Sequence, residues 1–202
     1  MSGVPDRRRP GPRGTLVRGI LLLARGRAEG LEQFGYTPQA FLTSLAPLLA
    51  VPVAGYLLLA LSGGGPHRGE AGALVDLLGT VCALLAPAVL SFELARRWGR
   101  QALWLRYATA LNWTQWVLPL LTSVLLLGVY PLLAALVSPQ IGLGLIGITI
   151  AGYALWLHWF IARTGLALDG GRAALLVIVV NLITGLLVLG PRLLALGAGR
   201  IG

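Results

Sequence analysis

Few polar side chains interrupt the long apolar runs of this sequence, so any chemistry inside those runs must use them. They comprise two carboxylates, one imidazole, three carboxamides and one hydroxyl: Asp76, Glu93, His158, Asn112, Gln115, Asn181 and Thr114. A histidine can move a proton near neutral pH, and carboxamides can hold a ligand by hydrogen bonds. These residues are far apart in the sequence, so packed helices would have to bring them together.

Each of these residues also has a structural explanation, and we expect that structural role before any role in chemistry. Asp76 and Glu93 lie close to the ends of apolar runs and can reach lipid headgroups. Asparagine and glutamine in apolar helices more often join neighbouring helices than bind ligands. His158 stands in the aromatic segment 156–160, typical of a belt at the membrane surface. The competing site hypothesis is a small polar cavity, with the candidate cluster Glu93, Asn112, Gln115, His158 and Asn181.

The sequence predicts no catalytic, cofactor-binding or metal-binding residues. The single cysteine, Cys82, cannot form an internal disulfide or a multi-cysteine metal site. Gly142, Gly144 and Gly147 lie in an apolar run and lack the strand and helix that flank a phosphate-binding loop, so we expect them to serve close helix packing. Membrane-embedded catalysis needs several positioned acid, base or metal groups. We therefore expect the chain not to be an enzyme.

The elements that position these residues are predicted to be membrane-spanning helices. Of 202 residues, 56% are hydrophobic and 11% charged, and the mean hydropathy is +0.81. Uncharged runs of about 20 residues recur, the length that a helix needs to cross a bilayer. We expect an all-α membrane protein whose five-helix domain, residues 41–196, has spans near 41–62, 71–94, 107–130, 141–162 and 173–196. Residues 107–137 form either one long tilted span or a span followed by a surface segment.

An N-terminal amphipathic helix is expected to precede the spans. Residues 1–14 combine arginine, proline and glycine, which predicts a flexible basic tail, and no cleaved signal peptide is expected. Over residues 15–34 apolar positions recur at spacings of three and four, as in a helix with one apolar face. Two placements remain open. The helix either binds anionic lipid through Arg18, Arg25 and Arg27, or packs on the helix bundle.

The arginine distribution predicts the orientation. All sixteen basic residues are arginine, which indicates a GC-rich bacterial genome. Counted over alternate connections, 13 arginines lie on the side of the N-terminus and three on the other. The positive-inside rule then predicts a bacterial inner-membrane protein with a cytoplasmic N-terminus and the C-terminus on the opposite side. The arginines flank the spans and do not alternate with stacking aromatics, so we expect lipids, anionic ones included, and a membrane protein as partners, and no nucleic acid.

Several local patterns follow one another in the N-terminal third. They are the amphipathic segment 16–20, Arg27-Ala-Glu29, Thr37-Pro38 and a proline-broken first span at 45–55. This arrangement resembles the bacterial branch of the Yip-domain family, the Ypt/Rab-interacting five-span membrane proteins. Segment 101–108 is similar too. In two places the sequence departs from the family pattern, at Asn112-Trp-Thr-Gln-Trp116 and at Asp169-Gly-Gly-Arg172.

The resemblance implies a non-enzymatic membrane scaffold or trafficking-type adaptor. The residues themselves leave a second possibility open. A small transporter or channel component would use a polar path near Asn112, Gln115, His158 and Asn181.

Overall fold

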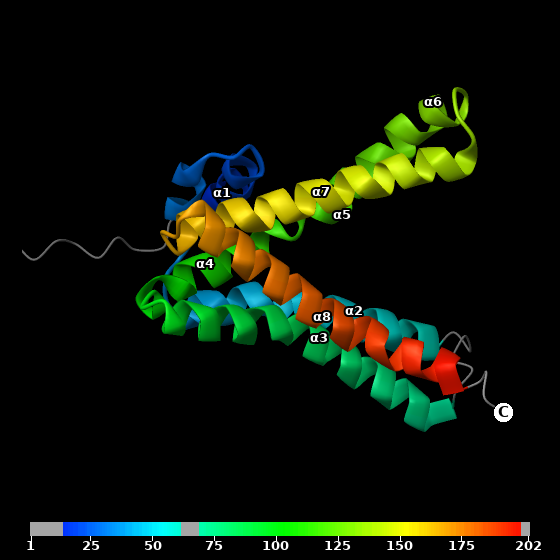
Figure 1. Ribbon diagram of the computed structural model, residues 1–202, viewed down its shortest axis with the longest axis horizontal. Coiled ribbons are helices and arrows are strands. Elements are labelled where there is room, and N and C mark those ends of the chain that lie inside the picture. The colour runs from blue at the N-terminus through cyan, green and yellow to red at the C-terminus, as the bar shows by residue number, and fades with distance from the viewer. Residues whose placement is uncertain (1–13, 62–68, 199–202) are drawn as a thin grey trace, which may run out of the picture.

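The computed structural model describes residues 14–61 and 69–198, and all regular structure within them is helical (Figure 1). The predicted tail, apart from Gly14, and most of the first connection between spans lie outside these ranges. The elements are α1 Gly14–Ala24, η1 Ala28–Gln33, α2 Pro38–Leu61, α3 Gly69–Arg97, α4 Gln101–Thr114, α5 Val117–Val124, η2 Leu125–Val129, α6 Tyr130–Ala134, α7 Pro139–Gly165 and α8 Gly170–Ala198.

Within the described ranges, five stretches are long and apolar enough to cross a membrane. They are Pro38–Gly55, Leu77–Arg97, Gln101–Ala134, Pro139–Gly165 and Gly170–Gly190. Many large apolar side chains on them are exposed, among them Leu127 at 81% and Ile148 at 73%. Such a surface suits lipid as the surrounding solvent. The prediction of an all-α, multi-pass membrane protein with five spans is confirmed.

The helices meet at one end of the molecule and diverge toward the other (Figure 1). The end where they meet, called the compact end here, contains α1, η1, α4, the last turns of α3 and α7 and the first turns of α8. Its core includes Leu23, Tyr107, Ile161, Leu166 and Leu176, all 0% exposed. From it two arms extend. In the α7 arm, α6 packs against the first half of α7, and in the α8 arm, α3 packs against α8.

The N-terminal segment is a docked hairpin and not one continuous helix over 15–34. α1 ends at Ala24, and the turn that follows contains Gly26, whose φ of 73° is a left-handed conformation that glycine adopts without strain. The short 3₁₀ helix η1 then folds back on α1, so closely that a Cβ on Gly30 would lie 2.7 Å from the Gly19 carbonyl oxygen. Leu31 and Phe34 are buried in the core of the compact end. The hairpin therefore packs on the bundle, which is one of the two placements that the sequence left open.

The third span is one long helix broken twice. Pro119 has no backbone N–H, so the Gln115 carbonyl loses its usual partner four residues on and accepts a bond from the Leu118 N–H at 3.1 Å instead. The break at residues 115–116 separates α4 from α5. A π-helical turn, η2, precedes Pro131 for the same reason. Of the two expectations for residues 107–137, the structure has the single long span, running from Gln101 to Ala134.

Two short turns at the compact end fix the helix junctions. Gly99, with φ 68°, ends α3 through bonds from its own N–H to Arg96 and from the Arg100 N–H to Ala95. Ala167 holds the same left-handed position after α7, with φ 50°. Asp169 then caps α8, since its Oδ1 accepts the Arg172 N–H at 2.9 Å.

Candidate membrane-embedded polar site

A chain of polar side chains joins three helices where the two arms diverge. The Tyr107 hydroxyl of α4 lies 2.7 Å from Nε2 of His158 on α7. On the other side of the ring, Nδ1 lies 3.2 Å from the amide nitrogen of Asn181 on α8. Tyr107 is completely buried, and its ring stacks on the imidazole with centroids 6.2 Å apart. These contacts join α4, α7 and α8, from the buried Tyr107 to Asn181 on the exposed side of α8.

The donors around His158 assign its tautomer. The Asn181 amide nitrogen also donates to the Val177 carbonyl at 2.8 Å, which fixes that nitrogen, and not the amide oxygen, toward the ring. Nδ1 of His158 therefore accepts, and in a neutral imidazole Nε2 then bears the proton and donates to the Tyr107 oxygen. Both ring nitrogens are occupied within the protein. In this arrangement the imidazole bridges α4 and α8 through both of its ring nitrogens.

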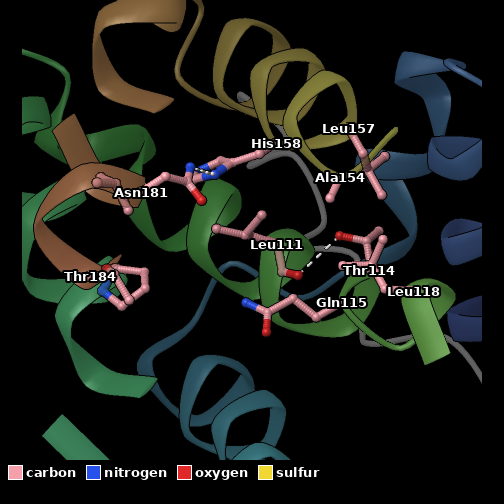
Figure 2. A pocket seen from close by; sticks show the side chains of 11 residues that line it. Leu111, Thr114, Gln115, Leu118, Ala154, Leu157, His158, Asn181 and Thr184 are labelled. Carbon is pink, nitrogen blue, oxygen red and sulfur yellow. Dashed lines mark hydrogen bonds between the residues drawn. The ribbon is translucent and has the colours of Figure 1, made fainter. Parts of the chain in front are cut away.

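A cavity of about 210 Å³ lies beside this chain, at the break in the third span (Figure 2). Five helices contribute to its wall, and the lining residues are Pro87, Leu111, Thr114, Gln115, Leu118, Ala154, Leu157, His158, Val180, Asn181 and Thr184. Its depth follows from the helical rise of 1.5 Å per residue. His158 lies about 10 Å from the end of α7 and Asn181 about 17 Å from the start of α8, so both residues lie inside the candidate membrane spans and away from these helix ends.

Three of the five predicted cluster residues line this cavity, and two do not. Gln115, His158 and Asn181 come together there. Asn112 is buried on another side of α4, where its amide donates to the Ser44 hydroxyl of α2 at 3.0 Å. Glu93 lies near the end of α3 and pairs with Arg96 and Arg97 at 2.8 and 2.9 Å. Asn112 thus joins helices, and Glu93 belongs to the surface of the compact end.

Sequence reasoning missed two residues of the site. Tyr107 is the first residue of the third predicted span, and a tyrosine at that position of an apolar run needs a hydrogen-bond partner when buried. Thr184 lies one turn beyond Asn181 on α8, a spacing that puts both on one face of the helix. Its hydroxyl is buried and has no hydrogen-bond partner in the described part of the chain.

The predicted lipid-binding arginines lie on the N-terminal hairpin. The side chains of Arg18, Arg25 and Arg27 are exposed, as are the apolar side chains of Val17 and Leu21 on either side of Arg18. Six further arginines lie at the same end: Arg96, Arg97, Arg100, Arg106, Arg163 and Arg172. The compact end is therefore strongly basic.

Within residues 14–61 and 69–198, no group of three or more histidine, cysteine, aspartate or glutamate side chains is placed to hold a metal ion. The chemistry that the cavity offers is hydrogen bonding by uncharged groups. Comparison of the chain with protein-family models, with curated proteins and with solved structures finds no match in any of the three.

Proposed function

We propose that this chain is a non-enzymatic scaffold of the bacterial inner membrane, similar in role to the Yip-domain proteins, which organises the membrane or binds partner proteins within it. In this proposal the compact end and the N-terminus face the cytoplasm, and the C-terminus lies on the opposite side. The excess of arginine at the compact end supports that orientation.

The observation that supports a scaffold best is that polar contacts join the helices at the compact end, from which two apolar arms diverge. At the compact end polar side chains form hydrogen bonds with one another: His158 with Tyr107 and Asn181, and Asn112 with Ser44. The arms diverge from there and leave large apolar side chains exposed along α7 and α8. Helices in lipid associate through such surfaces and through small residues. Gly144, Gly147 and Gly152 of α7 have nothing within 4 Å of where a Cβ would be, so a partner helix has room to approach them.

The basic end supports a second contact, with anionic lipid. Each arginine near an anionic surface contributes about 1 kcal/mol to lipid attraction. The exposed Val17 and Leu21 beside Arg18 would enter the headgroup boundary while the rest of the hairpin stays docked. Replacing Arg18, Arg25 and Arg27 by glutamine should lower the enrichment of phosphatidylglycerol around the purified protein, measured by native mass spectrometry. Phosphatidylcholine enrichment is the control and should not change.

Photo-crosslinking in the membrane tests the scaffold role directly. A photoreactive amino acid is placed at Ile148 or Leu127 on the α7 arm, and at Leu176 in the core as the control, since Leu176 is 0% exposed. A scaffold predicts discrete protein adducts from the arm positions and adducts only within the chain from Leu176. Adducts with lipid alone at several arm positions would contradict the proposal.

The cavity supports a second candidate, a small transporter or channel component with a polar path past Gln115 and Asn181. Water access separates the two candidates. With the one native cysteine, Cys82, replaced by alanine, cysteines are introduced at Gln115 and Thr184, and at the exposed apolar-face position Thr149 as the control. A water-filled path predicts rapid modification of the first two by a membrane-impermeant maleimide. Protection of all three positions would exclude the path.

A further inference from the structure

We infer that the cavity at the break in the third span binds the uncharged, hydroxyl-bearing head of a single membrane amphiphile, such as a diacylglycerol or a long-chain alcohol, whose apolar tails lie between the two arms. This inference depends on the membrane placement of the chain and not on the scaffold role, so each can fail without the other.

Three hydrogen-bonding groups around the cavity have no partner among the described residues. The Asn181 carbonyl oxygen turns away from the His158 ring (Figure 2), and the hydrogen bonds of that side chain run through its nitrogen alone. No described residue bonds the Gln115 amide, and the Thr184 hydroxyl is buried without a partner. In lipid such unpaired groups are costly, and a bound hydroxyl satisfies them. It would donate to the Asn181 oxygen and accept from the Gln115 nitrogen.

The head that fits must be uncharged. His158 is the one titratable side chain in the lining, and both of its nitrogens are already bonded to Tyr107 and Asn181. No lining residue is an arginine or a carboxylate that could neutralise an ion. At a depth of roughly 10 to 17 Å below the ends of the helices, an unpaired charge would be strongly unfavourable. A phosphate-bearing head is thereby excluded, whereas an alcohol tolerates this depth.

The volume and the lining of the cavity indicate a ligand that has a small polar head and apolar tails. A volume near 210 Å³ is below the range of about 300 to 1,000 Å³ for pockets that enclose whole ligands, so the cavity suits part of a larger molecule. Apart from Thr114, whose hydroxyl bonds carbonyls of its own helix, the remaining lining is apolar, with Pro87, Leu118 and Val180 on three different helices. The two arms diverge from this level, and their exposed side chains offer apolar surface to acyl chains.

Photolabelling of the full chain in phosphatidylcholine nanodiscs tests the inference. The probe is a diacylglycerol with a diazirine on one acyl chain, and labelled residues are located by peptide mass spectrometry. Three unlabelled competitors separate the possible sources: dioleoylglycerol, dioleoylphosphatidic acid with the same tails and a charged head, and glycerol with the hydroxyls but no tails. We expect labels concentrated on α5 and α8 next to the cavity, competed by dioleoylglycerol and not by the other two.

Variants assign the labelling to the cavity. Gln115→Met with Thr184→Val removes two hydrogen-bonding groups at nearly constant volume and should reduce specific labelling at least about fivefold. Should that pair fail to fold, Thr184→Val alone should reduce labelling about twofold to threefold. The control is Thr149→Val, whose hydroxyl bonds its own helix at 2.8 Å on the exposed face of α7, and it should label as the parent does.

Three results would overturn the inference. Labels spread evenly over the lipid-facing residues would show that the cavity selects nothing. Equal competition by dioleoylphosphatidic acid would show that the head need not be uncharged. Competition by glycerol would identify a water-soluble solute as the ligand in place of a membrane amphiphile.

Discussion

The Tyr107 hydroxyl and Nε2 of His158 lie 2.7 Å apart, and this contact joins α4 to α7 at the level where the arms diverge. Tyr107→Phe keeps the ring and leaves the Nε2 proton without an acceptor, so we expect the free energy of unfolding to fall by about 1 to 2 kcal/mol. Unfolding by sodium dodecyl sulfate in mixed micelles measures it.

A double-mutant cycle with His158→Leu isolates the pair. Because both variants remove the same bond, their effects should be less than additive, with a coupling energy of about 0.6 to 1.7 kcal/mol. Full additivity of the two losses would mean that the bond contributes nothing to the fold.

Asn112 and Gln115 are both amides near the end of α4, yet the structure gives them different roles. Asn112→Leu removes a buried bond to Ser44 and should cost about 0.6 to 1.7 kcal/mol of unfolding free energy. Gln115→Met removes no bond within the described chain and should change stability by less than about 0.5 kcal/mol. The same detergent unfolding assay compares them. Equal losses would mean that Gln115 also makes a hydrogen bond that stabilises the fold, contrary to the structure.

The membrane helices could be predicted from the sequence because their apolar runs are about as long as the bilayer is thick. The break after Gln115 has its cause in Pro119, which has no backbone N–H to bond the Gln115 carbonyl. The helix packing could not be predicted, since apolar faces of similar composition do not specify neighbours in lipid. Asn112 was therefore grouped with Gln115, although it faces α2 and not the cavity.

The N-terminal hairpin illustrates a related limit. A periodicity of three and four predicted one helix over 15–34. The helix α1 instead ends at Ala24, because Gly26 takes a left-handed backbone conformation in the turn that follows. The choice between lipid and bundle depended on close contact of Gly19 with Gly30, which composition cannot reveal. The side chains of Arg18, Arg25 and Arg27 are exposed on the outer surface of the hairpin.

Gly30→Ala tests how the hairpin is held. The new Cβ would lie 2.7 Å from the Gly19 carbonyl oxygen and 2.8 Å from Leu23, so η1 must move away from α1. We expect faster amide hydrogen exchange across residues 16–34. Gly152→Ala is the control, because nothing lies within 4 Å of that position and alanine favours a helix. Unchanged exchange in Gly30→Ala would contradict the close packing.

Ala167→Gly should stabilise the protein. Ala167 has φ 50°, a conformation that costs an L-residue about 1 to 2 kcal/mol, and glycine avoids that cost while gaining freedom in the unfolded chain. The net gain in unfolding free energy should be about 0.5 to 1 kcal/mol. Ala151→Gly on the exposed face of α7 should lose about 1 kcal/mol, because glycine disfavours a helix interior. A loss for both variants would argue against a left-handed residue at 167.

Asp169, in the turn between α7 and α8, should make stability depend on pH. The Arg172 backbone N–H bonded to its carboxylate, with the Arg172 charge, holds the pKa of Asp169 below its ordinary value of 3.8. A depressed pKa in the folded state means that the ionised cap stabilises the protein above the ordinary pKa, and that this stabilisation is lost as the pH falls through the folded pKa. Asp169→Asn keeps a side-chain oxygen for the cap and has no proton to gain in this range. The parent protein should therefore lose more thermal stability than Asp169→Asn between about pH 6 and pH 3, and the gap between the two proteins should narrow toward the acid end. Thermal unfolding in a nonionic detergent, followed by circular dichroism at each pH, measures that gap. A gap that stays constant over the whole range would mean that the ionised carboxylate stabilises the cap no more than a neutral amide does. The loss of stability on acidification would then come from other groups.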